Sequence, residues 1–292
     1  MKPPPARTKR ILALAKYGDM AASTRQRLQQ FLPAMSAAGY EVEMRPLFGN
    51  DYLVALNRRE RLPRSEIARA YIRRFADVRD AGAYDAVWLA YEQFPYLPSL
   101  IETAFIPIDV PLILDFDDAI FHQYDSHRLA PVRALLGGKL QGLMRRAAVC
   151  TAGNAYLADY ARRFCSDVRI IPTVVDTAEY RPALRDRSDN SAVVGWIGSP
   201  STWAFVQPLV PHLQKLAARP GARVKIVGAG RLAAPPEGID FVDWSEECEI
   251  AEIQSMDIGI MPLPDEPFAR GKCGYKLIQY GACGLPVVAS PV

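Results

Sequence analysis

The sequence of 292 residues has few cysteines, few histidines and no long apolar run, and each shortage excludes a class of protein. Its five cysteines are scattered without any C-x-x-C pair, so neither a disulfide framework nor a zinc knuckle is indicated, and reduced thiols in the cytoplasm are expected. The three histidines do not have the spacing of a helical metal pair. No run of about 18 uncharged apolar residues occurs, which predicts a soluble or at most peripheral protein.

The charge is close to balanced, with 35 basic and 32 acidic residues and a net charge of +3. This balance, and the lack of any sequence motif typical of nucleic-acid recognition, argue against nucleic-acid binding. Residues 57–79 hold eight arginines and three acids, interleaved with Ile67, Tyr71, Ile72 and Phe75. Such a basic amphipathic helix can rest on anionic lipid, which predicts peripheral membrane contact. The alternative is an ordinary exposed arginine-rich face.

Short apolar segments alternate with amphipathic ones along the whole chain. Ser23 and Gln26 match a capping box, so we expect a helix from there to Gly39. Further helices are expected at 203–218, in the Glu-rich segment near 250, and at 274–283. Strands are expected at 11–16, 40–45, 85–90, 112–116, 147–151, 168–171, 192–197, 224–227, 241–242, 258–261 and 287–289. This alternation is typical of α/β proteins with doubly wound parallel sheets.

A polar stretch divides the chain into two expected domains. We place a linker at 181–191, an N-terminal domain at 1–180 and a C-terminal domain at 192–292, both Rossmann-like and facing a cleft. The last strand, 287–289, should enter the middle of a parallel sheet, where both faces need cover. We therefore expect the second domain to be truncated.

The segment from Asp257 to the end carries a candidate anion site. Lys272, Lys276, Gln279 and Cys283 are spaced to share one face of a helix. Two ammonium groups near a helix N-terminus can hold a diphosphate, because free N–H groups and the helix dipole favour anions there. The alternative is a solvated lysine face.

At this point the sequence resembles a known family. The run YKLIQYGACGLPVVAS is similar to the C-terminal signature of group 1, or family 4, glycosyltransferases. STRQRLQQFLPAMSAAGYEV, LILDFDDAIF, VCTAGNAYLADYARRF, IIPTVVDTAEY and VVGWIGSPST resemble other segments of that family in order. The resemblance implies the GT-B fold and transfer of a sugar from a nucleotide-diphosphate donor, with retention and without a metal or cofactor. The implied acceptor is a lipid-linked or cell-envelope glycan, as in polysaccharide biosynthesis.

The chain departs from the family at its E-x7-E motif. The two glutamate positions hold Gly271 and Gln279. Gln279 can still hydrogen-bond a ribose hydroxyl, whereas Gly271 supplies no carboxylate; Asp265 or Glu266 would have to replace it. This departure motivates an alternative function, a weak or inactive homologue that keeps the fold and donor binding. An unrelated doubly wound enzyme is a third hypothesis.

Polar residues after the fourth expected strand are the catalytic candidates. Asp117, Asp118 and His122 follow strand 112–116, where doubly wound folds place their chemistry. Asp115 and Asp117 also form a D-x-D pair, so a metal site is one alternative. A cluster that caps the next helix is another.

Two glycine turns are the remaining donor-site candidates. Residues 228–233 fit G-x-G-x-x-A, but Pro235 and Pro236 would stop the helix that NAD binding needs. The turn after strand 192–197 offers hydroxyls at a helix start, although these could merely cap that helix. The donor-site candidates in these turns are Gly198, Ser199, Ser201, Thr202, Gly228 and Arg231.

Overall fold

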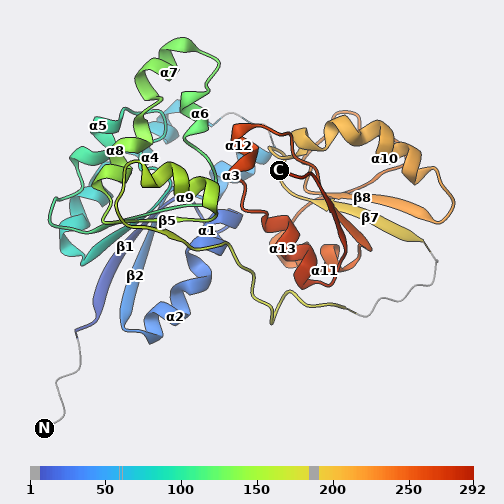
Figure 1. Ribbon diagram of the computed structural model, residues 1–292, viewed down its shortest axis with the longest axis horizontal. Helices are drawn as coiled ribbons and strands as arrows, with labels where there is room; N and C mark the ends of the chain where they lie inside the picture. Colours follow the sequence, from blue (N-terminus) through green and yellow to red (C-terminus); the bar gives the residue numbers. More distant parts are fainter. Residues whose placement is uncertain (1–6, 59, 61, 184–190) are drawn as a thin grey trace, which may run out of the picture. The chain divides into compact units, whose positions relative to one another are not determined.

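The computed structural model describes residues 7–58, 60, 62–183 and 191–292, which form two compact units (Figure 1). The first unit comprises the described parts of Met1–Ala55, Arg61–Thr173 and Arg270–Cys273. The second comprises those of Leu56–Glu60, Val174–Ala269 and Gly274–Val292. The predicted linker at 181–191 falls mostly on residues 184–190, outside the described residues.

The first unit is built on a six-stranded parallel sheet in the order β2-β1-β3-β4-β5-β6. The strand order reverses between β1 and β3, so the loops after these two strands flank a topological switch point, where doubly wound sheets bind ligands. The strands are β1 (Lys9–Tyr17), β2 (Tyr40–Phe48), β3 (Ala86–Ala90), β4 (Leu112–Phe116), β5 (Val149–Ala152) and β6 (Val168–Ile170).

Helices cover both faces of this sheet, since α4, α5 and α8 lie on the side away from α2 (Figure 1). The central strands are apolar on both faces for that reason, and Leu12, Leu14, Leu89 and Leu114 are fully buried. The helices are α1 (Ala22–Arg27), α2 (Leu32–Ala37), α3 (Asn50–Asn57), α4 (Arg64–Arg79), α5 (Ser99–Ala104), α6 (His122–Asp125), α7 (Ala130–Leu136), α8 (Lys139–Arg146) and α9 (Ala155–Arg162).

The single helix predicted from Ser23 to Gly39 is wrong. The segment forms α1, a 3-10 turn at Gln29–Phe31 and α2, and the residue before α1, Ala21, makes no side-chain cap. The break has a local cause, because Pro33 lacks the N–H that a continuous helix would direct at the carbonyl of Gln29.

The basic stretch folds mainly as α4, and its apolar residues largely face inward. Tyr71 donates to Pro95 O at 2.6 Å, and the ring of Phe75 stacks on Phe94 at 4.3 Å. Arg74 is buried and donates to carbonyls of the sheet, whereas Ile72 is 69% exposed. None of the helices within the described ranges combines the length and apolar character needed to cross a bilayer.

The second unit contains a five-stranded parallel sheet in the order β11-β10-β7-β8-β9, so its switch point lies between β7 and β10. Both units are therefore doubly wound, as predicted. The strands are β7 (Ala192–Ile197), β8 (Ala222–Val227), β9 (Asp240–Val242), β10 (Ile258–Met261) and β11 (Val287–Ala289). The later helices of the chain are α10 (Val210–Ala217), α11 (Glu246–Gln254), α12 (Pro267–Arg270) and α13 (Tyr275–Ala282).

Two expectations about this unit are wrong. The helix predicted at 203–218 is two 3-10 turns, Trp203–Phe205 and Gln207–Leu209, followed by α10. Pro208 and Pro211 are each the second residue of a new element there, because neither can donate to a preceding turn. Strand β11 lies at the edge of the described sheet rather than in its middle, and Val288 is 64% exposed.

Candidate functional site

The carboxyl end of β4 carries a buried ion pair. Asp115 accepts two hydrogen bonds from Arg27, at 3.0 Å from Nε and 2.5 Å from Nη2, and a third from the hydroxyl of Thr151 at 2.5 Å. Arg27 also donates to Ile171 O at 2.6 Å. Both carboxylate oxygens of Asp115 are occupied by this arrangement, so the alternative of a metal site formed by Asp115 and Asp117 does not fit the structure.

Asp117 has an unusual environment for a carboxylate. Burial, aided by the negative charge of Asp118, raises its pKa from 3.8 to about 6. The hydroxyl of Tyr91 donates to Oδ1, and Thr173 donates to Oδ2 at 3.5 Å. A carboxylate with a pKa near 6 can exchange a proton close to neutral pH, which is a property of catalytic acids and bases.

Asp118 forms an ion pair with Lys272 at 2.8 Å. Lys272 precedes α13, which begins at Tyr275 after Gly274 with φ of +66°, so it does not share a helix face with Lys276 as predicted. The structure instead brings a predicted donor-binding lysine together with a predicted catalytic aspartate, both in the first unit.

The segment around Lys272 is fixed by close packing. The side chain of Asn154 donates to the carbonyls of Gly271 and Lys272, each at 3.1 Å, and the thiol of Cys273 donates to Asp117 O at 3.0 Å. A Cβ at Gly271 would lie 2.4 Å from Cβ of Ala119. This contact explains why the position holds glycine rather than the glutamate of the resembled motif.

His122 is the first residue of α6, and its ring contacts Asp125 and Tyr156 rather than the two aspartates before it. Its Nδ1 lies 2.9 Å from Asp125, and its Nε2 lies 2.8 Å from the hydroxyl of Tyr156. The cap position of α6 is Phe121, without a side-chain cap, so the alternative of a helix-capping aspartate cluster is wrong. Asp117 and Asp118 thus lie in the loop after β4 and His122 on the helix that follows it, and their roles stay predictions.

In the second unit the two predicted glycine turns touch each other. A Cβ at Gly228, where φ is +80°, would lie 2.2 Å from Gly198 O. The hydroxyl oxygen of Thr202 accepts from the N–H of Ser199 at 3.1 Å. The hydroxyl oxygens of Ser199 and Ser201 lie 2.9 Å apart. Thr202 precedes the 3-10 turn at Trp203–Phe205 and makes no side-chain cap there, so the capping alternative is wrong for this residue. Arg231 is exposed beyond the second turn.

Lys276 and Gln279 lie on α13 in different surroundings. The ammonium of Lys276 lies 5.7 Å from the ring centroid of Trp196. Gln279 is 3% exposed, and its amide donates to Glu249 at 2.8 Å and to the hydroxyl of Tyr180 at 3.3 Å.

Sequence reasoning missed the partners of Gln279. Glu249 also accepts from the indole of Trp244 at 2.6 Å and from the hydroxyl of Tyr180. The only signal in the sequence is that Glu249 stands four residues before Ile253, on the buried face of its helix.

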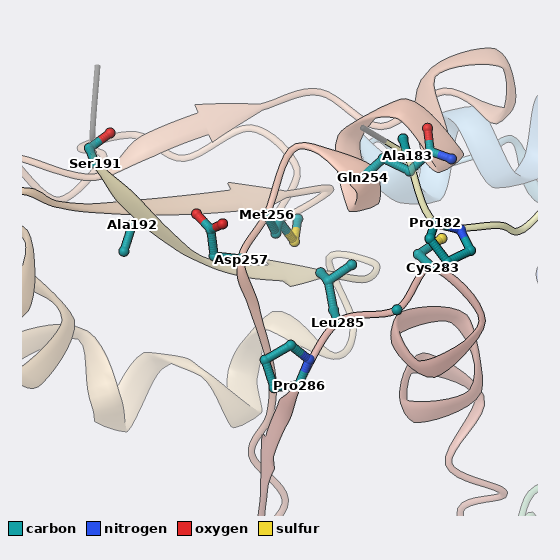
Figure 2. Close-up of a pocket in the computed structure, with 11 residues that line it drawn as sticks. Pro182, Ala183, Ser191, Ala192, Gln254, Met256, Asp257, Cys283, Leu285 and Pro286 are labelled. Carbon is teal, nitrogen blue, oxygen red and sulfur yellow. The ribbon is translucent and has the colours of Figure 1, made fainter. Parts of the chain in front are cut away.

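A pocket of about 450 Å³ lies elsewhere in the second unit (Figure 2). Ala192, Asp257 and Pro286 line it, and these residues precede or begin β7, β10 and β11. The pocket is therefore at the amino ends of the strands. The glycine turns are at the carboxyl ends, where doubly wound sheets bind their ligands, so this pocket is not the donor-site candidate.

Comparisons with known proteins agree with this architecture. Residues 191–292 match the family model described as Glycosyl transferases group 1. Among curated proteins, none matches the chain significantly by sequence. The solved structures that resemble it include three transferases, each at 15% identity or less, which defines the fold alone.

An alpha-glucosyltransferase in complex with UDP and a DNA 13-mer is 14% identical, with a TM-score of 0.61, over 97% of this chain and 80% of that one. HepE from Anabaena, in complex with UDP and glucose, is 15% identical, with a TM-score of 0.60, over 97% and 81%. WaaG, a glycosyltransferase involved in lipopolysaccharide biosynthesis, is 11% identical, with a TM-score of 0.62, over 97% and 81%. Residues 191–292 therefore resemble a group 1 glycosyltransferase domain, and the chain has the GT-B fold.

Proposed function

We propose that this protein transfers a sugar from a nucleotide-diphosphate donor to a glycan or lipid-linked acceptor, with retention and without a metal ion. The match of residues 191–292 to the group 1 family carries the proposal. It is supported by the crystal structure of HepE, a protein of similar fold that was solved in complex with UDP and glucose.

The donor would bind at the carboxyl edge of the second sheet. Gly198 and Gly228 let two backbone turns approach each other there, and without side chains at these positions a ligand could come close to the backbone. Ser199, Ser201 and Thr202 would contribute hydroxyls, and Lys276 at the first turn of α13 would neutralise the diphosphate. Gln279 and Arg231 complete the candidate set; because the amide nitrogen of Gln279 donates to Glu249 and Tyr180, only its amide oxygen could accept from ribose.

In the reaction, the bond from the anomeric carbon to the diphosphate oxygen breaks, and the diphosphate leaves with the electron pair. The acceptor hydroxyl oxygen forms the new bond and gives up its proton. Asp117 is suited to hold that proton, because its pKa is raised to about 6 by burial and by Asp118. Lysine ammonium groups and helix N–H groups would take over the charge stabilisation that a metal provides in other enzymes.

A weak or inactive homologue is the second candidate function, and one observation favours it. Gly271 supplies no carboxylate, and a larger residue would collide with Ala119. Such a protein would keep donor binding through the second unit and lack transfer.

The proposal includes a cytoplasmic location, consistent with five free cysteines, and peripheral membrane contact through 57–79. Because Tyr71 and Phe75 pack inward, that contact would depend on Ile72 and on the exposed arginines of α4, which are Arg64, Arg69, Arg73 and Arg79. Sedimentation with anionic vesicles, compared for the wild type and Ile72→Ser, tests it. An equal bound fraction for both would remove the membrane from the proposal.

A thermal-shift screen with UDP-, GDP- and ADP-sugars tests donor binding, because a ligand of the folded state raises the midpoint of unfolding. Product analysis with the stabilising donor and simple glycosides, in EDTA and with added magnesium, then tests transfer. Transfer in the presence of EDTA supports the transferase. Donor binding with neither sugar transfer nor hydrolysis of the donor supports the inactive homologue. The absence of any stabilising donor would contradict both.

A further inference from the structure

Three tyrosines meet at the switch point of the first sheet, apart from the aspartates after β4. Tyr17 ends β1, Tyr52 lies on α3, and Tyr96 lies in the loop after β3. The rings of Tyr17 and Tyr52 are stacked, with centroids 5.9 Å apart. Tyr96 is linked to this pair through Glu92. Lys16, next to Tyr17, lies 3.4 Å from Glu92, and Glu92 accepts at 2.7 Å from the hydroxyl of Tyr124, which in turn accepts from the N–H of Tyr96.

The backbone of Tyr96 is held in an unfavourable conformation. Its φ is +60°, a region that residues with a Cβ rarely occupy. Its N–H donates to the hydroxyl of Tyr124 at 3.2 Å, and the two rings meet edge to face at 5.6 Å. The side chain nevertheless remains 59% exposed. A strained residue that presents an exposed ring on a supported backbone indicates a binding role rather than a packing one.

The hydroxyl groups of these three tyrosines differ from those of most other tyrosines in the chain. Those of Tyr71 and Tyr124 each donate to a protein oxygen, as do several more in the chain. No residue that the structure describes forms a hydrogen bond with the hydroxyl of Tyr17, Tyr52 or Tyr96. These three groups are therefore available to a ligand.

Four charged side chains near Tyr17 and Tyr124 pair with one another. Lys16 lies 3.4 Å from Glu92, which also pairs with the buried Lys139 at 2.8 Å, and Lys139 in turn contacts Glu102. Two ammonium groups are paired with two carboxylates, so none of these four groups offers an unpaired charge to a ligand. A neutral ligand fits this balance.

We propose that Tyr17, Tyr52 and Tyr96 form a subsite for a neutral pyranose ring of the acceptor. The proposal rests on the proposed function and specifies its acceptor. The apolar C–H face of a pyranose matches the exposed ring of Tyr96, and its hydroxyls match the three phenols. The position agrees as well, since the loops after β1 and β3 flank the switch point.

Saturation-transfer NMR with the full chain and methyl glycosides of glucose, mannose and galactose tests the subsite. Tyr96→Gly removes the ring and suits the positive φ, so the variant should fold. Tyr40→Gly removes a tyrosine at the amino end of β2, on the opposite edge of the same sheet, and serves as the control. At least one glycoside should bind the wild type and the control variant, and about tenfold more weakly the Tyr96→Gly variant.

Tyr96→Phe should lose less, because it keeps the stacking face. Equal glycoside binding by Tyr96→Gly and the wild type, or none by the wild type, would overturn the subsite. Saturation confined to the aglycone of an aryl or alkyl glycoside would also overturn it in favour of an apolar acceptor group. A UDP-sugar thermal shift on the same samples separates the two proposals. Stabilisation by a UDP-sugar without glycoside binding contradicts only the subsite. Glycoside binding without stabilisation by a UDP-sugar contradicts only the proposed transferase.

Discussion

The amide of Gln279 donates to Oε1 of Glu249 at 2.8 Å inside the second unit, where both side chains are almost fully buried. The family signature has glutamate at this position. In this chain a glutamate at position 279 would place a second carboxylate directly against Glu249. The amide of Gln279 avoids this repulsion and donates a hydrogen bond to Glu249 instead. The identity of residue 279 therefore follows from a partner on another helix.

Restoring the family's glutamate should therefore harm the protein. We expect Gln279→Glu to lower the free energy of unfolding by roughly 2–4 kcal/mol at pH 7, because two buried carboxylates cannot both ionise at this distance. Urea unfolding measures the loss, which should shrink as the pH falls and one carboxyl takes up a proton. The exchange variant Gln279→Glu with Glu249→Gln should recover most of the stability. A stable single variant would contradict the contact.

The ion pair of Arg27 and Asp115 should stabilise the first unit far more than a surface pair does. Arg27→Ala leaves a buried carboxylate without its partner, and we expect a loss of about 3–5 kcal/mol. Arg162→Ala breaks the exposed pair with Asp159 and should cost less than about 1 kcal/mol. Thermal or urea unfolding compares the two variants, and equal losses would argue against the buried pair.

Asp117 should make stability depend on pH in a predictable direction. Burial, with Asp118, raises its folded pKa from 3.8 to about 6, so the folded state binds the proton more readily than the unfolded state. Stability should therefore fall as the pH rises from 3.8 to 6, by at most about 3 kcal/mol, and the penalty is complete above 6. Asp117→Asn should flatten this dependence in urea titrations between these pH values. A slope that is unchanged in the variant would refute the assignment.

Lys276 should contribute to donor affinity. Lys276→Ala removes a charge-assisted contact worth roughly 1.5–3 kcal/mol, so nucleotide binding should weaken by about ten- to a hundredfold. Calorimetric titration with the donor identified by the screen measures this. Lys215→Ala, at an exposed position on α10, is the matched control and should bind as the wild type does. Unchanged affinity in Lys276→Ala would remove this lysine from the donor site.

Much of the fold could be predicted from the sequence, because buried parallel strands have local signatures. The segments Leu112–Phe116 and Ala192–Ile197 are short, mainly apolar runs bounded by proline, glycine or polar residues, and both are strands with the predicted limits. The helices were harder. Pro33 divides one expected helix, and the helix periodicity around it gave no sign of the break.

The candidate site could be predicted only in part, because its contacts join distant positions. Asp117 and Asp118 follow a strand, which indicates their edge of the sheet. The partner of Asp118 is 154 residues away in Lys272, and no local pattern links the two. The same holds for Gln279 and Glu249, 30 residues apart on separate helices.

The placement of Arg270–Cys273 has a consequence for anyone who wishes to study the two halves separately. These four residues belong to the first compact unit, although the chain on both sides of them belongs to the second. A single cut near residue 180 would not produce two self-contained halves. The amino-terminal piece would leave the carboxylate of Asp118 without its lysine and the methyl group of Ala119 without its cover. A faithful isolated first half would have to carry this tetrapeptide grafted back as an extra loop.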